Sequence, residues 1–185
     1  MPVRRISVRE AQTTLQDMAG ALASSRQHIV VEVPGTQGLA ILSAEMLFAL
    51  EESLELMCDT EQYERIKAGE SALVSGAFVS QGEFEQEMGL STRTMPSRWR
   101  LVVSGPARRA ILGLPVETSR PKVLEFITGD LLENPGIVGV ELEGQLARRH
   151  AAAVADQRVI YRMDPSNRAV RVIDVQRAER VFIRR

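Results

Sequence analysis

The stretch "HAAAVADQRVIYRMDPSNRAVRVIDV", residues 150–175, decides the fold of the C-terminal half of the chain. Apolar and polar residues alternate with a period of two in "RVIYRM" and again in "AVRVIDV", and this spacing predicts β-strands with one apolar face. The intervening "DPSN" consists of turn-forming residues. We therefore predict an antiparallel meander that begins with "HAAAVA" and ends with a last short strand at "RVFI", 180–183.

A strand and two helices are predicted before the meander. "WRLVV", which begins at Trp99, is typical of a strand, and Ser104 with Pro106 predicts the start of a helix that Pro115 stops. "RPKVLEFITGDLLENP", residues 120–135, predicts one further helix. This order of elements predicts an α+β domain in which a helical hairpin packs on one face of an antiparallel sheet.

The N-terminal half has a different pattern. Ser7 and Glu10 form a capping-box pair at the start of a helix over 8–24, and "HIVVEVPGTQGLAIL" reads as a hairpin over 28–42. A helix over 44–57 carries one narrow apolar seam of the kind that packs on a partner helix. An acid-rich helix over 61–75 and a short capped helix after Ser80 follow.

Charge divides the chain into two parts. Residues 1–95 hold seven Lys and Arg against 14 Asp and Glu, a net charge of −7, whereas residues 96–185 hold 16 against 10, a net charge of +6. Such asymmetry indicates two units with different partners, or two units that are each other's partner. The sign changes within the aperiodic run "GLSTRTMPS", so we place a linker at 89–97.

Composition excludes several classes of protein. With 185 residues, 44% of them hydrophobic, the chain can form one ordinary core or two small ones. The single cysteine, Cys58, cannot form an internal disulfide, and no apolar run is long enough to span a membrane, so we expect a cytoplasmic protein with no membrane partner. With only two histidines and one cysteine, we expect no metal site and no cofactor.

Both halves resemble known families. "ISVREAQTTLQDM" through "ALEESLELM" resembles the Phd/YefM antitoxins, and "ERIKAGESALVSGAFVS" extends the likeness to mycobacterial RelB-type members. "FITGDLLENP", "ADQRVIYRMD" and "VRVIDVQRAERVFIRR" resemble the RelE/ParE toxins. The resemblance implies an α+β fold in two domains, with a Phd/YefM-like domain at 1–60, an acidic toxin-wrapping segment at 61–88, and a RelE/ParE-like domain at 98–185.

The Phd/YefM resemblance implies that the first domain forms a homodimer and binds operator DNA. The segment before the first helix and the start of that helix would meet the DNA, which assigns the DNA contacts to Arg4, Arg5, Ser7 and Arg9. The hairpin turn, basic in relatives, has no positive charge here, so we expect weak and salt-sensitive binding. The alternative is that Arg4 and Arg5 belong to a solvated terminus.

The RelE resemblance implies cleavage of mRNA on the ribosome, which needs a base, an acid and cations that stabilise the phosphate charge. The residues that fill the family's site positions are Glu141, Glu143, Ala153, Arg177 and Phe182. Only Arg177 keeps its chemical character, and the two carboxylates repel phosphate. We therefore expect the site to be catalytically degenerate, with little ribonuclease activity.

Four other residues invite a functional interpretation. His150 beside Arg149 offers a proton shuttle for a shifted site, but a solvated His at the rim is the expectation. Arg158 is expected to brace the sheet, while Trp99 and Tyr161 are expected in the core.

These observations favour a fused toxin–antitoxin protein that acts as a DNA-binding autoregulator or as an antitoxin. Its expected partners are operator DNA, a second copy of itself, and its own other half, docked within the chain or swapped between chains. A related free toxin is a further candidate partner. The alternative is a latent ribosome-dependent mRNA interferase inhibited in cis, and a third reading is a ParE-like protein that binds gyrase.

Overall fold

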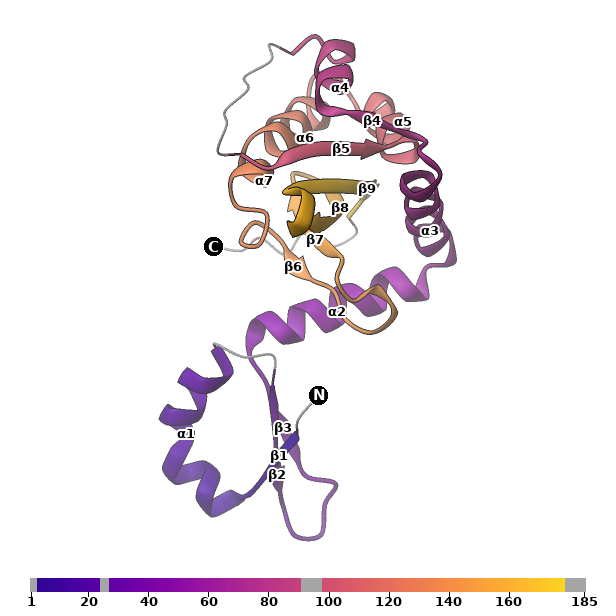
Figure 1. Cartoon of the computed structure of the whole chain (residues 1–185). Coiled ribbons are helices and arrows are strands. Elements are labelled where there is room, and N and C mark those ends of the chain that lie inside the picture. Colours follow the sequence, from indigo (N-terminus) through magenta and orange to yellow (C-terminus); the bar gives the residue numbers. More distant parts are fainter. Residues whose placement is uncertain (1–2, 24–26, 91–97, 179–185) are drawn as a thin grey trace. The chain divides into compact units, whose positions relative to one another are not determined.

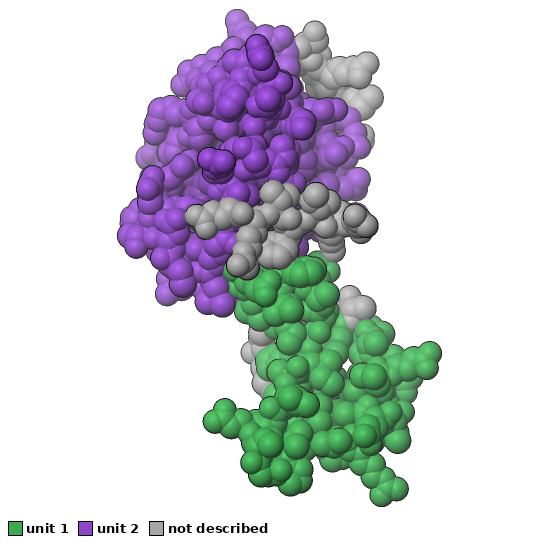
Figure 2. Space-filling view, turned by 180° about the vertical axis from the view of Figure 1, so that it is seen from behind, with its two compact units in different colours: residues 1–51 green, residues 52–185 purple. Residues whose placement is uncertain are grey.

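The computed structural model describes residues 3–23, 27–90 and 98–178. The chain divides into two compact units, residues 1–51 and 52–185 (Figures 1 and 2). The division precedes the acidic segment, whereas the sequence places its linker at 89–97. None of the helices described is long and apolar enough to cross a membrane.

In its described residues, the first unit has a three-stranded sheet, one complete helix and the first turns of a second helix. Parallel strands β1 (Val3–Ser7) and β2 (His28–Glu32) are joined by α1 (Val8–Ala23), and β3 (Leu39–Ile41) pairs antiparallel with β2. The predicted hairpin is therefore confirmed, whereas β1 was not predicted as a strand. The buried residues of this unit's core are Ile6, Met18, Leu22, Ile29 and Val31.

The second unit is built on a six-stranded sheet with the order β4-β5-β9-β8-β7-β6. All neighbouring strands are antiparallel except β5 and β9, which are parallel. The strands are β4 (Phe78–Ser80), β5 (Arg100–Ser104), β6 (Val140–Glu141), β7 (His150–Val154), β8 (Gln157–Asp164) and β9 (Ala169–Arg177). The predicted meander corresponds to β7, β8 and β9, but the last predicted strand, 180–183, lies outside the described residues.

In the part of the chain that the structure describes, six α-helices accompany this sheet. They are α2 (Ala44–Cys58), whose last turns belong to the second unit, α3 (Thr60–Ser75), α4 (Gln81–Glu87), α5 (Gly105–Gly113), α6 (Ser119–Thr128) and α7 (Asp130–Glu133). The prediction of one helix over 120–135 was wrong, because the helix breaks at Gly129. A Cβ at this position would lie 2.7 Å from the Glu125 carbonyl oxygen, so glycine permits the break.

Two apolar cores lie on the two faces of the sheet. On one face, α5, α6 and α7 pack on β5, β8 and β9, as expected for the helical hairpin. On the other face, Leu56 of α2 with Ile66 and Leu73 of α3 packs on Ile160 and Ile173. Helices from the N-terminal half of the chain thus cover the face that the C-terminal half leaves open.

The acidic segment also supplies a strand to this sheet. β4 pairs antiparallel with β5, with Phe78 opposite Ser104 and Ser80 opposite Val102. The Ser80–Glu83 capping box that begins α4 is present as predicted, and Gly76 ends α3 in the left-handed conformation. Residues 52–88 are consequently part of the same folded unit as residues 98–178.

Candidate functional site

The guanidinium of Arg158 on β8 is almost fully buried in the second unit. This residue is 1% exposed, and it forms ion pairs with Glu52 and, at 2.7 Å, with Glu55 of α2. A third bond, 3.0 Å long, runs from Arg158 Nη1 to Gln62 Oε1 of α3. Burial raises the pKa of Glu52, and the charge of Arg158 opposes that rise.

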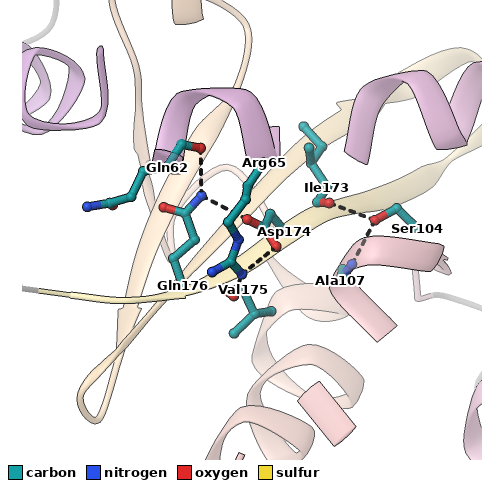
Figure 3. A network of polar contacts seen from close by, with 8 residues as sticks. All are labelled: Gln62, Arg65, Ser104, Ala107, Ile173, Asp174, Val175 and Gln176. Atoms are coloured by element: carbon teal, nitrogen blue, oxygen red, sulfur yellow. Dashed lines mark hydrogen bonds and ion pairs between the residues drawn. The ribbon is translucent and has the colours of Figure 1, made fainter. Parts of the chain in front are cut away.

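A second polar network joins α3 to β9 (Figure 3). Arg65 Nη2 donates to Asp174 Oδ1 at 3.0 Å and to the Val175 carbonyl at 2.7 Å. Gln176 Nε2 donates to the carbonyl of Gln62 at 3.0 Å and to Asp174 Oδ2 at 2.8 Å. Asp174 is fully buried, so its charge is compensated by these two donors rather than by water.

Further contacts join residues 52–88 to the C-terminal half of the chain. Arg149 makes a bidentate ion pair with Glu70 of α3, at 2.7 and 2.6 Å, and Arg108 pairs with Glu87 of α4. The bond from Arg108 lowers the pKa of the Glu87 carboxyl. The backbone N–H of Glu143 donates to Ser53 Oγ at 2.7 Å. Carboxylates of residues 52–88 therefore neutralise three arginines of the basic half through specific contacts.

The four predicted toxin-site residues that the structure describes are not gathered into one cluster. Arg177 is exposed at the end of β9 and lines an open depression of about 500 Å³ together with Arg65 and Gln62. Glu141 pairs in the sheet with His150, at the opposite end of β7 from Ala153, which is exposed.

The remaining members differ in their surroundings. Glu143 is buried, and Glu141 accepts a 3.2 Å bond from the backbone N–H of Arg148. Phe182 lies outside the described residues.

The structure overturns one expectation for a side chain and confirms another. His150 is buried and stacks on Tyr161, with 5.2 Å between ring centroids, so the expectation of a solvated rim histidine was wrong. Tyr161 is in the core as predicted, and its hydroxyl donates to the Pro135 carbonyl at 2.6 Å. Arg158 pairs with Ala153 in the sheet register, so a cation does lie beside that alanine.

Sequence reasoning missed the ion cluster of Arg158 because its partners are about 100 positions away in the chain. One local signal was present. Glu52 and Glu55 are spaced by three residues, which places both carboxylates on one face of a helix. Two carboxylates on one helix face favour a shared cation as their partner.

The predicted DNA-contact residues Arg4, Arg5, Ser7 and Arg9 all lie in the first unit, on β1 and at the start of α1. Arg4 pairs with Glu10 at 3.0 Å and Arg5 pairs with Glu32 at 3.5 Å. Because Arg4 and Arg5 are successive residues of β1, their side chains point to opposite faces of the sheet.

The start of α1 is capped by the residue that precedes it. Ser7 Oγ accepts from the backbone N–H of Glu10 at 3.2 Å, as the predicted cap requires. The carboxylate of Glu10 bonds Arg4, so the second half of the predicted capping box is replaced by an ion pair. Arg9 is exposed on the first turn of α1.

Comparison with known proteins identifies the family. The chain is 32% identical over 79 residues to the protein named Toxin RelE from Mycobacterium tuberculosis, a match that covers 43% of this chain and 80% of that toxin. The chain belongs to the RelE toxin family. No protein-family model matches the RelE-related chain. A solved structure, the toxin–antitoxin complex RelBE2 from Mycobacterium tuberculosis, aligns with a TM-score of 0.42 and 30% identity over 44% of this chain and 99% of the matched one.

Proposed function

We propose that this RelE-family chain is a fusion of an antitoxin with a toxin, and that residues 52–88 neutralise residues 98–185 within the same chain. The observation that carries the proposal is the way α3 and β4 are built into the sheet. α3 contributes Ile66 and Leu73 to one core, and β4 is hydrogen-bonded to β5. Opposite charges on the two partners favour their association and fix its register.

A split-chain experiment tests this proposal. Residues 1–90 and 98–185 are co-expressed as separate chains, with an affinity tag on the first. We expect the two chains to copurify, because α3, β4 and the ion pairs are all retained. The matched control is residues 1–51 with the same partner, which keeps the first unit and removes the acidic segment. Equal recovery with both N-terminal fragments would contradict neutralisation by residues 52–88.

The toxin half is proposed to be catalytically degenerate. Among the family's site positions, Glu141, Glu143 and Ala153 lack the expected positive charge, and Arg177 is the retained cation. The full chain should therefore leave mRNA uncut on ribosomes, and residues 98–185 expressed alone should not arrest growth. Growth arrest with ribosome-dependent cuts would contradict degeneracy, and arrest without cuts would favour a protein target such as gyrase.

A latent mRNA interferase is the second candidate, and Arg158 favours it. A guanidinium can bind a phosphate through two parallel bonds, and in this chain the carboxylates of Glu52 and Glu55 occupy that guanidinium. Glu52→Ala/Glu55→Ala in the full chain should then produce mRNA cuts that Arg158→Gln abolishes. Absence of cuts in a folded double variant would rule this candidate out.

The first unit is proposed to dimerise and to bind operator DNA. Its small core leaves Leu39, Leu47 and Phe48 exposed, which supports burial of this apolar surface against a second copy. Arg4, Arg5 and Arg9, with Ser7 as a backbone contact, are the proposed DNA contacts. A gel shift of the full chain on its upstream DNA tests this at low salt. We expect Arg4→Ala/Arg5→Ala/Arg9→Ala to lose the shift, and a shift that survives in this variant would contradict the assignment.

A further inference from the structure

The loop between β6 and β7, residues 142–149, packs against helices from the N-terminal half of the chain (Figure 1). Leu142 is fully buried, and Leu146 is 1% exposed. Both leucines belong to the core that Leu56 of α2 and Ile66 of α3 complete. Without α2 and α3 the two leucines would lose this apolar cover, so the hydrophobic effect favours the present loop conformation only while these helices are docked.

Polar contacts tie the same loop to α2 and α3. In loop order, the Glu143 N–H donates to Ser53 Oγ at 2.7 Å, the Tyr63 hydroxyl donates to Gln145 Oε1 at 2.9 Å, and Arg149 donates to both carboxylate oxygens of Glu70 at 2.7 and 2.6 Å. These contacts lie at the start, the middle and the end of the loop. The helices therefore hold the loop along its whole length.

Arg149 connects the ion pair to the backbone of the loop. Its Nε and Nη2 donate to the Glu70 carboxylate, while its Nη1 donates to the carbonyls of Gln145 at 3.0 Å and Ala147 at 3.2 Å. One planar guanidinium thus binds a carboxylate of α3 and two carbonyls of the loop. Because the bidentate pair fixes the orientation of the guanidinium, loss of Glu70 would also release the group that supports the loop backbone.

The loop backbone is strained at Arg148. Its φ of 67° lies in the left-handed region, which a non-glycine residue seldom adopts. The Arg148 N–H donates to Glu141 Oε1 at 3.2 Å, which holds this turn locally. Strained conformations of this kind persist where the surrounding structure imposes them. We therefore expect the loop to relax to another conformation once its contacts with α2 and α3 are removed.

We propose that residues 52–88 hold loop 142–149 in a closed conformation, and that the loop opens when these residues leave the sheet. This inference rests on the proposed neutralisation and states how it acts on the toxin-like half. The loop contains Glu143 and directly follows Glu141, two of the positions that the RelE resemblance assigns to the toxin site. Docking of α2 and α3 therefore fixes the conformation of a segment that carries part of that site.

The test is hydrogen–deuterium exchange of the full chain, measured by mass spectrometry on peptides that cover residues 142–149. Glu70→Gln removes the charge that orients Arg149, and Tyr63→Phe removes the bond to Gln145. We expect amide exchange in the loop to rise by about tenfold in this double variant, because a bond to a charged group is lost from the closed state. Amides of β8 and β9 should stay within about twofold of their wild-type exchange, because the apolar cores keep the helices docked.

Matched variants separate the loop contacts from general effects on α3. Glu64→Gln removes an exposed carboxylate of the same helix that pairs with Lys67, and it should keep the wild-type exchange of the loop. Arg149→Lys keeps the positive charge but lacks the planar fork, so it should open the loop as the double variant does.

Two outcomes would overturn the proposal. One is unchanged loop exchange in the double variant or in Arg149→Lys, and the other is an equal rise in β8 and β9 or in the Glu64→Gln control. The copurification of the split chain measures neutralisation separately, so the loop proposal can fail while the proposed function stands.

Discussion

At the scale of single residues, Arg158 is the buried cation that neutralises Glu52 and Glu55 in the second unit. Two carboxylates from α2 and one amide from α3 converge on a guanidinium that is almost fully buried. A buried ion pair adds little net stability relative to an apolar replacement, but breaking it leaves an uncompensated charge in the interior. The cluster therefore fixes the register of α2 on β8 more than it adds free energy.

Replacing Arg158 alone should be costly. We expect Arg158→Met to lower the free energy of unfolding by about 3–5 kcal/mol, because Glu52 and Glu55 lose their cation. Adding Glu52→Leu and Glu55→Gln should restore most of the loss. Urea denaturation measures the free energy of unfolding of the wild type, of Arg158→Met and of the triple variant. Arg162→Met on the same strand is the control. Arg162 lies directly opposite Arg171 in the sheet, so this change removes a like-charge pair and should be neutral or slightly stabilising. A loss in the control as large as in Arg158→Met would contradict this account.

Asp164 should give the protein a measurable acid dependence. Hydrogen bonds from Asn167 and Arg171 lower its pKa from 3.8 to about 2. The unfolded chain therefore binds more protons between these values, so the contribution of Asp164 to stability is complete above about pH 4 and is lost as the pH falls toward 2. Thermal unfolding of Asp164→Asn should lack this component. Glu117→Gln, at an exposed loop position, should keep the wild-type profile.

At the scale of secondary-structure elements, local signals predicted most of the fold. The caps of α3, α4 and α5 each depend on residues within a few positions, and the sequence shows them directly. The strand β1 was missed because five residues that pair in parallel with a distant strand leave no periodic signal. The break between α6 and α7 depends on one glycine inside an otherwise helical pattern, and such a glycine is ambiguous in sequence.

The contact between α3 and β9 depends on Gly69. A Cβ on this residue would lie 2.1 Å from the Ile173 carbonyl oxygen, which belongs to the backbone and cannot rotate away. Gly69→Ala should therefore push α3 from the sheet and cost about 1–3 kcal/mol of stability. Gly82→Ala in α4, where nothing lies within 4 Å, is the matched control and should be neutral or stabilising. Chemical denaturation compares the two, and equal effects would contradict a close approach at Gly69.

At the scale of the whole chain, the opposite charges of the two halves become specific pairs in the second unit. The sequence indicates the sign of each partner, but only the fold assigns Glu70 to Arg149 and Glu87 to Arg108. The candidate toxin site, likewise, could be predicted only in part from the sequence. Its residue types could be read from the sequence, whereas the ion pairs over Arg158 depend on contacts between distant segments.

Cutting the chain within residues 91–97 should leave its two parts associated. α3, β4 and α4 precede this stretch, yet they share one compact unit with residues 98–178. A protease site placed there, followed by complete cleavage, should give a single peak in size-exclusion chromatography with both fragments present. An uncut sample of the same protein is the reference. Separation of the fragments without denaturant would contradict the tight packing of residues 52–88.

The strand β4 has one more consequence, for solubility. Without it, β5 would present a row of unpaired backbone N–H and C=O groups, and such a sheet edge is a template for pairing with other chains. β4 is only three residues long, which makes it a poor template itself. Residues 78–80 therefore protect the edge of β5 against aggregation. Because both halves are made as one polypeptide, the toxin-like half has this protection as soon as it is synthesised.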